Sequence, residues 1–304
     1  MNPIVGIGEL LWDVYPDGRK VAGGAPFNFA FHCHQLGHPA VVVSRVGADD
    51  LGRELRERVR ELGLSDEFIQ TDPEHPTGTV QVTLDAHAVP AYTITENVAW
   101  DFLAWDDKLA ELANGARGVC FGTLGQRGES SEAIVRFVRD ACGGGTGAHR
   151  IFDVNLRQHF YAFGVLRASL YRSPDVKVSE DELRTVCETL GLSGDDTAAR
   201  VRSIFEFSSA ETRCVYVTRG ADGAEAYYER DPKPVVVPGV PAKVVDTVGA
   251  GDAFTAAVMC LLAEGRSMEE QVRFAVHYAA RVCEQPGGTP RIDRTEIARD
   301  AGLV

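Results

Sequence analysis

Short apolar runs rich in β-branched residues alternate with longer amphipathic segments along most of the chain. The apolar runs predict β-strands at Ile4–Ile7, Ala40–Val46, Gly118–Gly122, Arg150–Val154, Asp175–Val178 and Arg213–Thr218. The amphipathic segments predict helices at Pro26–Leu36, Asp50–Leu62, Ser130–Cys142, Glu180–Leu190 and Thr197–Phe205. This alternation is typical of βαβ units, so we expect an α/β fold with a largely parallel sheet covered by helices.

Two segments break this rhythm. Leu10–Tyr15 has a strand-like pattern and follows Ile4–Ile7 with no helix between them. Thr79–Leu84 and Ala91–Thr95 alternate with period two around a turn near His87–Pro90, which predicts a hairpin. Strands inserted early in an α/β chain in this way predict a small antiparallel sheet beside the main one.

Composition and charge narrow the class of protein. The chain has 304 residues, 44% of them hydrophobic and 25% charged, which is ordinary for a soluble globular protein of one large domain or two smaller ones. The net charge of −13 and the absence of a basic stripe disfavour nucleic acids and anionic membranes as partners. There is neither a signal-peptide pattern nor an apolar run long enough to span a membrane, so we expect a cytoplasmic enzyme.

The sequence gives little support to several common kinds of functional site. Seven cysteines without a CxxC pair predict neither a disulfide framework nor a zinc ribbon, and the His34 and His38 pair lacks a third metal ligand. A glycine cluster, CGGGTG at 142–147, predicts a loop. GIGELL at Gly6–Leu11 begins like a dinucleotide-binding fingerprint, but Leu11 replaces its third glycine. Neither a GxxxxGK[ST] phosphate loop nor a GxSxG motif occurs.

Polar residues gather where predicted strands end or helices begin. Gly23 and Gly24 permit close backbone approach just before a helix whose first turn carries Asn28, although an ordinary helix start has the same pattern. Asp153, Asn155 and Arg157 end a strand on alternate positions and face either a crevice or solvent. In VKVSEDEL, the acids after Ser179 also suit the positive end of a helix dipole.

VVDTVGAGDAF, starting at Val244, is the most specific segment. A strand-like KVV leads to Asp246 and Thr247, which are suited to fix a turn. Gly249, Ala250 and Gly251 then present backbone amides at a helix N-terminus, which predicts an anion hole. An N-cap role for Asp252 would explain one acid but not the two glycines or the upstream Asp-Thr pair.

DTVGAGDAF strongly resembles the C-terminal signature of the ribokinase-like (PfkB) carbohydrate kinases, D-T-x-G-A-G-D. The resemblance extends over nearly the whole chain. GGAPFNFA resembles the family's sugar-binding glycine motif, SRVGADDLGRE its VG-x-D-x-x-G element, and VTRGADGA its phosphate-holding turn. GELLWDVYP, PTGTVQV, the AWD at 99–101 and FDVNLR are most similar to bacterial fructokinases.

The resemblance implies a site, position by position. Asp252 matches the catalytic base, Gly249, Ala250 and Gly251 match the anion hole, and Arg157 falls near the phosphoryl path. The positions implied to bind the sugar are Asp13, Gly23, Gly24, Asn28 and Asn155. Those implied to bind the nucleotide are Thr218, Gly220 and Gly223. Glu182 matches a position that holds Mg²⁺ through water, and Asp246 one that helps to bind a monovalent cation such as K⁺.

The resemblance also implies an architecture and two differences. We expect a single ribokinase-like domain over 1–304, a three-layer α/β/α fold with a β lid built from about 10–25 and 78–98 that mediates homodimerisation. The family's NxxE element is Ser179-x-x-Glu182 here, without its Asn. Val276 stands where the adenine-side helix often has Asn, so nucleotide selectivity stays open.

These residues predict an ATP-dependent sugar kinase, with fructose as the leading substrate and fructose 6-phosphate as product. Alternatives of the same fold act on 2-keto-3-deoxygluconate, ribose or a nucleoside, and a non-catalytic sugar-binding regulator or a nicotinamide oxidoreductase are rivals from other classes. The transition state of phosphoryl transfer is loose and anionic, so amides at a helix N-terminus would stabilise it. We also expect the helix dipole to lower the pKa of Asp252.

Overall fold

A mostly parallel sheet forms the centre of the protein. The computed structural model describes residues 2–84, 90–143, 147–209 and 211–303. Nine strands of this part pair in the order β13-β12-β11-β10-β9-β8-β1-β4-β5. Their bounds are β1 Ile4–Ile7, β4 Ala40–Gly47, β5 Ile69–Asp72, β8 Gly118–Phe121, β9 His149–Asp153, β10 Asp175–Ser179, β11 Cys214–Thr218, β12 Ala224–Tyr228 and β13 Asp231–Val237. Neighbours from β11 to β5 run parallel, whereas β12 and β13 pair antiparallel.

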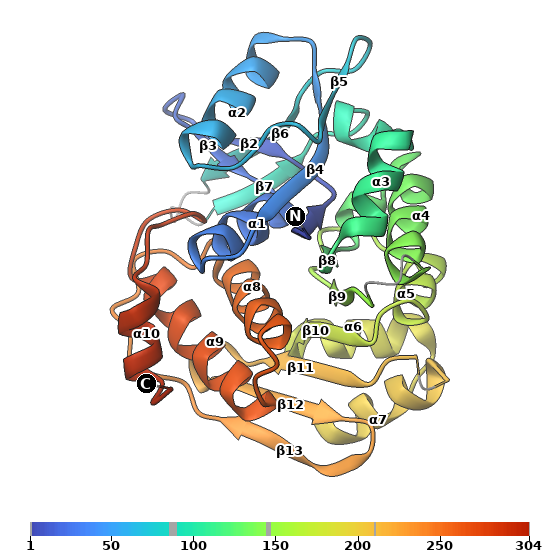
Figure 1. Cartoon of the computed structure of the whole chain (residues 1–304), viewed down its shortest axis with the longest axis vertical. Helices are drawn as coiled ribbons and strands as arrows, with labels where there is room; N and C mark the ends of the chain where they lie inside the picture. Colours follow the sequence, from blue (N-terminus) through green and yellow to red (C-terminus); the bar gives the residue numbers. More distant parts are fainter. Residues whose placement is uncertain (1, 85–89, 144–146, 210, 304) are drawn as a thin grey trace.

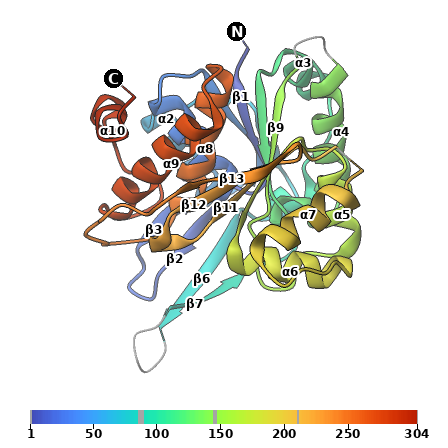
Figure 2. The ribbon, with the colours of Figure 1, turned by 90° about the horizontal axis from the view of Figure 1, so that it is seen from below.

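Helices cover both faces of this sheet (Figures 1 and 2). Their bounds are α1 Ala25–Gln35, α2 Asp50–Glu61, α3 Asp107–Gly115, α4 Ser130–Gly143, α5 Phe163–Leu170, α6 Glu180–Leu190, α7 Thr197–Phe207, α8 Ala250–Ala263, α9 Met268–Cys283 and α10 Arg294–Asp300. In Figure 2, α8 and α9 lie on one side of the sheet and α3 to α7 on the other. Separate apolar clusters fill the two sides, which confirms the predicted three-layer α/β/α class. Within the described ranges, every helix is too short or too polar to cross a lipid bilayer.

A second, smaller sheet stands apart from the first. Its strands are β2 Leu11–Val14, β3 Lys20–Gly23, β6 Gly78–Leu84 and β7 Pro90–Ile94, in the order β3-β2-β6-β7. Figure 2 shows β6 and β7 projecting from the body, and we call this sheet the lid. The expectation of a purely antiparallel sheet is wrong, because β2 and β6 are not hairpin partners and pair in parallel. Of the turn predicted near 87–90, only Pro90 lies within the described residues, and residues 144–146 of the glycine loop predicted at 142–147 lie outside them.

The strand-like reading of KVV before Asp246 is also wrong. Val244 and Val245 are 62% and 60% exposed, and their backbone is irregular. The segment passes the end of α9 instead, where the backbone amide of Val245 donates to the carbonyl of Cys283 at 2.8 Å. β-Branched residues favour a strand only when a neighbouring strand is available to pair with them.

The lid is joined to the body through a buried ion pair. Arg127 donates from Nε to Asp101 Oδ1 at 2.8 Å and from Nη2 to Asp101 Oδ2 at 2.9 Å. The same Nη2 donates to the carbonyl of Thr95, just after β7, at 2.8 Å. The guanidinium carbon lies 4.1 Å from the centroid of the Trp100 ring, within the apolar cluster under the lid. Arg127 therefore holds the end of the lid to η1, a 3-10 helix at Ala99–Phe102.

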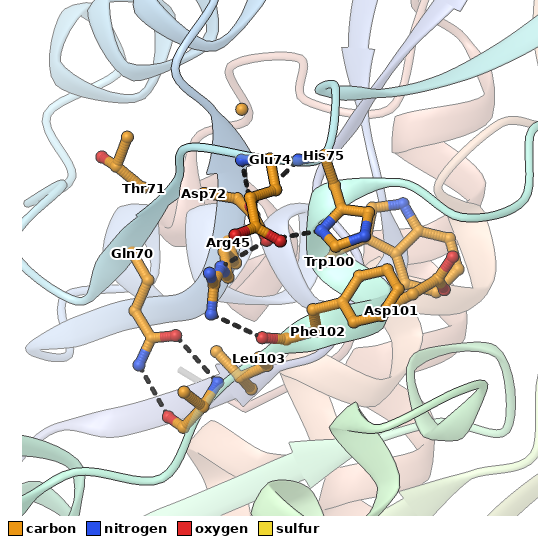
Figure 3. Close-up of polar contacts among 12 residues, drawn as sticks. Arg45, Gln70, Thr71, Asp72, Glu74, His75, Trp100, Asp101, Phe102 and Leu103 are labelled. Atoms are coloured by element: carbon orange, nitrogen blue, oxygen red, sulfur yellow. Dashed lines mark hydrogen bonds and ion pairs between the residues drawn. The ribbon is translucent and has the colours of Figure 1, made fainter.

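A polar cluster fixes the other side of η1 (Figure 3). Arg45, on β4, lies with Nε 2.9 Å from Asp72 Oδ2 and donates from Nη1 to the carbonyl of Phe102 at 2.7 Å. Asp72 Oδ1 accepts hydrogen bonds from the backbone amides of Glu74 and His75. The His75 ring stacks on Phe102 with 3.6 Å between centroids. These contacts give the lid a fixed base at the edge of the main sheet.

Candidate active site

The start of α8 forms a glycine-rich cradle of backbone amides. Gly249 precedes the helix with φ 76°, a left-handed conformation that favours glycine. A Cβ there would also lie 2.6 Å from Gly288 Cα. No side chain among the described residues caps this helix, so Asp252, on its first turn, is not an N-cap. The amides at the helix start therefore lack a side-chain cap, although that of Ala250 donates to the carbonyl of Thr247 at 3.3 Å, and the anion hole stays a prediction.

A second glycine turn supports the cradle from behind. Asp246 Oδ1 accepts from the amide of Val248 at 3.0 Å, and Oδ2 accepts from the amide of Gly287 at 2.9 Å. The neighbouring Gly288 carbonyl lies 3.0 Å from Nε2 of the buried His32 on α1. Asp246 thus shapes its own turn, as expected, and also ties that turn to the segment after α9.

Asp252 lies next to Asn28, although the two residues are far apart in the sequence. Asn28 lies on the first turn of α1 and donates from Nδ2 to Asp252 Oδ2 at 2.8 Å. Its Oδ1 is buried and has no hydrogen-bond partner within the described part of the chain. A buried acceptor without a partner costs free energy unless a ligand or water satisfies it. The pair therefore offers a carboxylate and an unfilled acceptor to one incoming polar group.

The expected lowering of the pKa of Asp252 by the helix dipole is wrong. Burial raises the pKa of Asp252 to about 6, and the negative charge of Asp153 adds to this effect. The hydrogen bond from Asn28 and the charges of Lys177 and Arg157 oppose it only in part. Loss of hydration thus outweighs the favourable end of the helix dipole. As a result Asp252 is a stronger base than an ordinary aspartate and still ionised at neutral pH.

The lid and α1 bring further acidic and glycine residues to this place. Burial raises the pKa of Asp13, on β2, to about 6. Gly23 ends β3 beside it, where a Cβ would lie 3.0 Å from Asp13 Oδ2. Gly24 has φ 115°, and a Cβ there would lie 2.4 Å from the carbonyl oxygen of Glu9. Gly24 is therefore required by its positive φ and its close approach to the Glu9 backbone, whereas a side chain at Gly23 would crowd Asp13.

Glu9 is a buried acid that sequence reasoning missed. It is 3% exposed, and its Oε1 accepts from the amide of Ala25, the first residue of α1, at 3.1 Å. Burial raises the pKa of Glu9 to about 7, and Asp252 contributes through charge repulsion. The sequence signal for a buried acid is the single charged residue within the apolar segment GIGELL, a segment that otherwise resembles the start of a nucleotide fingerprint.

Asn155 and Arg157 follow β9. Asn155 has φ 41°, and its carbonyl accepts from Thr123 Oγ1 at 3.2 Å. Arg157 is exposed and donates from Nη1 to the carbonyl of Leu156. Its positive charge lowers the pKa of Asp252, and it also opposes the raised pKa values of Glu9 and Asp13. Arg157 therefore acts on the acidic residues of the predicted site through its positive charge.

Lys177 is a second site residue that the sequence analysis did not identify. The register pairs Lys177 on β10 with Asp153 on β9, and Lys177 Nζ lies 3.1 Å from Asp153 Oδ1. Asp153 Oδ2 accepts from Thr255 Oγ1 of α8 at 2.7 Å. The signal was a charged residue between Val176 and Val178, because the inner strands of parallel sheets are usually apolar on both faces.

Glu182 is fixed at the start of α6. It forms a capping box with Ser179, whose amide donates to Oε2 at 2.8 Å, while the amide of Leu156 donates to Oε1 at 2.8 Å. Burial would raise its pKa, but the charge of Lys177 and these hydrogen bonds outweigh burial and lower it. The described residues include no group of three His, Cys, Asp or Glu side chains that could enclose a metal ion. Glu182 is thus a carboxylate that is fixed by hydrogen bonds and has a lowered pKa.

The predicted nucleotide positions lie at the same edge of the sheet. The register pairs Thr218, at the end of β11, with Ser179 at the end of β10. Gly220 and Gly223 have φ 55° and 92°, and a Cβ on Gly223 would lie 2.2 Å from the carbonyl oxygen of Val237. This turn therefore requires glycine. Val276 is buried on α9.

Comparisons with known proteins agree with this geometry. The model for pfkB family carbohydrate kinases matches residues 15–294. A fructokinase of Vibrio alginolyticus is 27% identical over 276 residues, covering 86% of this chain and 84% of that protein. The solved structure of an uncharacterised sugar kinase from Pyrococcus horikoshii has a TM-score of 0.82 at 26% identity, with 100% of this chain and 99% of that chain covered. A Xylella fastidiosa fructokinase with bound ATP has a TM-score of 0.84, with 99% of each chain covered, but at 21% identity it shows the fold alone.

A small lid sheet together with a buried carboxylate on the first turn of a glycine-rich helix start fits the class of phosphotransferases that act on a small alcohol. The fold is the ribokinase-like three-layer fold, in which a helix packed on the main sheet, α8, supplies the cradle and the small sheet supplies the lid. The chain belongs to the pfkB family of carbohydrate kinases. The predicted family, fold class and carbohydrate-kinase activity are thereby confirmed.

Proposed function

We propose that the protein transfers the γ-phosphoryl group of ATP to fructose, giving fructose 6-phosphate. The observation that carries this proposal is the Asp252 carboxylate held by Asn28 at the glycine-rich start of α8, where Asn28 Oδ1 finds no partner among the residues that the structure describes. Fructokinases among the relatives, at 27–29% identity, support fructose over other sugars. Kinases of the same fold that act on 2-keto-3-deoxygluconate, ribose or a nucleoside are the alternatives.

Each residue has a role in the proposed reaction. The sugar hydroxyl hydrogen-bonds to Asp252 and gives up its proton to that carboxylate as its oxygen bonds to the γ-phosphorus. The bond from the γ-phosphorus to the bridging oxygen breaks, and ADP leaves with that oxygen. The amides of Gly249, Ala250 and Gly251 hold the phosphoryl oxygens, and Arg157 adds positive charge. Asp13, Gly23, Gly24, Asn28 and Asn155 hold the sugar.

The nucleotide and ions fit the donor groups near this site. Thr218, Gly220 and Gly223 would hold the nucleotide phosphates at the end of β11. Glu182, a carboxylate fixed at the start of α6, would hold Mg²⁺ through water, and the ion would offset phosphate charge. Asp246 would contribute to a monovalent-cation site for K⁺.

A sugar panel and one substitution test the proposal. ADP release, measured with fructose, ribose, 2-keto-3-deoxygluconate and a nucleoside, should give the highest kcat/KM for fructose. Asp252→Asn should lower kcat by about 10²–10⁴-fold with little change in the KM for the sugar, because it removes the proton acceptor. Undiminished turnover in Asp252→Asn would contradict the mechanism, and a higher kcat/KM for another sugar would change the substrate.

A cytoplasmic location and a homodimer formed through the lid also stay predictions. The lid projects from the body in Figure 2, so it is placed where a second copy could pack against it. Light scattering on the purified protein would measure the mass in solution. A monomeric mass at working concentration would contradict the dimer.

A further inference from the structure

Lys177 is a buried charge in an otherwise apolar strand. Its neighbours Val176 and Val178 pack into the apolar cluster on one face of the main sheet, while Lys177 lies on the opposite face, toward α8. The residue is only 7% exposed. Burying a lysine is costly unless its charge is paired, so this position is occupied for a reason other than packing.

A continuous set of contacts links Lys177 to the anion hole. Its Nζ lies 3.1 Å from Asp153 Oδ1, and Asp153 Oδ2 accepts from Thr255 Oγ1 at 2.7 Å. Thr255 Oγ1 lies 3.0 Å from the carbonyl oxygen of Gly251, one turn earlier in α8. A Cβ placed on Gly251 would lie only 2.9 Å from Lys177 Nζ. The ammonium group therefore packs directly against the backbone that forms the predicted cradle.

The negative charge around Lys177 is greater than that of Asp153, the carboxylate with which it forms an ion pair. Burial alone would lower its pKa, but the charges of Asp153, Glu182 and Asp252 outweigh burial and raise it. The lysine therefore stays protonated. Without it, three carboxylates would surround a site that must accept a strongly anionic nucleotide phosphate.

Stability does not account for this arrangement. A buried ion pair is often no more stabilising than apolar residues of the same size, because dehydrating both ions offsets their attraction. A methionine would fill the same space without that cost. The contacts of Lys177 explain its presence instead, because it packs against the backbone at the base of the proposed phosphoryl site.

From this geometry we propose that Lys177 is a positioning residue for phosphoryl transfer. It holds Asp153 and Thr255 against Gly251, which fixes the amides at the start of α8, and it offsets the charge of the carboxylates around the phosphoryl path. The inference rests on the proposed function, because it assumes that the cradle receives the transferring phosphoryl group.

The test compares substitutions of Lys177 on whichever sugar the wild-type protein phosphorylates best. Lys177→Met should lower kcat by about 100-fold, the usual effect of losing one preorganised electrostatic group, while the KM for the sugar stays within about threefold. Lys177→Met/Asp153→Asn removes both charges, so that Asp153 is not left as a buried carboxylate without its direct partner. It should melt close to wild type and still have low kcat.

A matched control separates catalysis from stability. Tyr216, on the neighbouring strand β11, is buried and donates from its hydroxyl to Gln271 Oε1 at 2.7 Å. Tyr216→Phe should lower the melting temperature but leave kcat within about twofold of wild type, because a single buried hydrogen bond remote from the chemistry contributes to folding alone.

Two outcomes would overturn the inference. One is a double variant with wild-type kcat. The other is a loss of kcat in Tyr216→Phe as large as that in Lys177→Met. Failure of the proposed function is recognised separately, because it would be seen as an inactive wild-type protein across the whole sugar panel.

Discussion

At the scale of single residues, the site depends on a carboxylate whose neighbours adjust its proton affinity. Asn28 and Asp252 are 224 positions apart in the chain and meet at 2.8 Å. Burial and Asp153 favour the protonated form of Asp252, while Asn28 and Lys177 favour the ionised form. The balance leaves the pKa at about 6, close enough to neutrality for a base that accepts its proton during the reaction.

This balance predicts the acid side of the pH profile. With saturating sugar, kcat should fall about tenfold for each pH unit below about 6, because protonated Asp252 cannot accept the hydroxyl proton. Above that pH the residue is ionised and kcat should level off. Saturation with sugar limits the contribution of Asp13, whose pKa is also about 6.

A control identifies the titrating group. Glu9 has a pKa of about 7 and interacts electrostatically with Asp252, so it is the main rival. Glu9→Gln keeps an oxygen to accept from the amide of Ala25 and should retain the acid limb. If the limb disappears in Glu9→Gln, the assignment to Asp252 is wrong.

At the scale of elements, the function depends on how α8 begins. Gly249 combines a left-handed backbone with close contact to Gly288, so two separate demands exclude other residues. Gly265, just after the other end of α8, has nearly the same φ, 74°, but open space around it. Substitutions at the two glycines therefore distinguish the energetic cost of a left-handed backbone from the cost of a steric clash.

Alanine at these two positions should give different results. Gly265→Ala should lower the free energy of unfolding by about 1–2 kcal/mol, because a Cβ is unfavourable at positive φ, and Gly249→Ala should lower it further, because its Cβ also meets the backbone of Gly288. Only Gly249→Ala should also lower kcat, by at least about tenfold, because its Cβ displaces the turn behind the cradle. Urea unfolding and steady-state kinetics measure the two effects, and equal kcat in both variants would argue against a rigid cradle.

Some elements could be predicted from the chain and others could not. β1, β8 and β11 are continuous apolar runs, so their burial on both faces is visible locally. β5 reads IQTD, and its strand conformation comes from pairing with β4 rather than from its own residues. The exposed valines before Asp246 show the converse, since a strand-forming sequence without a partner strand remains irregular.

At the scale of the whole molecule, the lid is joined to the body through a few buried polar links. Asp101 and Arg127 form one of them, with side chains 5% and 11% exposed. Arg127 also reaches the carbonyl of Thr95 at the end of the lid. Closure over a sugar would therefore proceed around a fixed base.

Breaking this link should destabilise the protein strongly. Asp101→Ala leaves the Arg127 guanidinium buried and unpaired, so the free energy of unfolding should fall by about 3–5 kcal/mol. As a control, Glu61→Ala breaks the exposed pair with Arg58 and should change it by no more than about 1 kcal/mol. Urea denaturation measures both, and equal losses would mean that the buried link has no special role.

The arrangement of the whole molecule also explains which parts of the site can be predicted from the sequence. The cradle residues lie within one short segment, so their spacing alone predicts an anion hole. Lys177 and Glu9 are different, because their partners lie on other strands and helices and a charge inside an apolar run does not say what neutralises it. The pKa of Asp252 also depends on burial by distant segments, which local helix-dipole reasoning leaves out.

The turn at Gly287 and Gly288 has a consequence for the timing of synthesis. It buttresses Asp246 and packs against Gly249, yet it is translated long after Asn28. At ordinary rates of translation, the first sugar-side residues leave the ribosome on the order of tens of seconds before this turn does. The nascent chain therefore cannot complete its phosphoryl cradle until Gly287 and Gly288 have emerged, so ATP turnover is expected to begin only after that point.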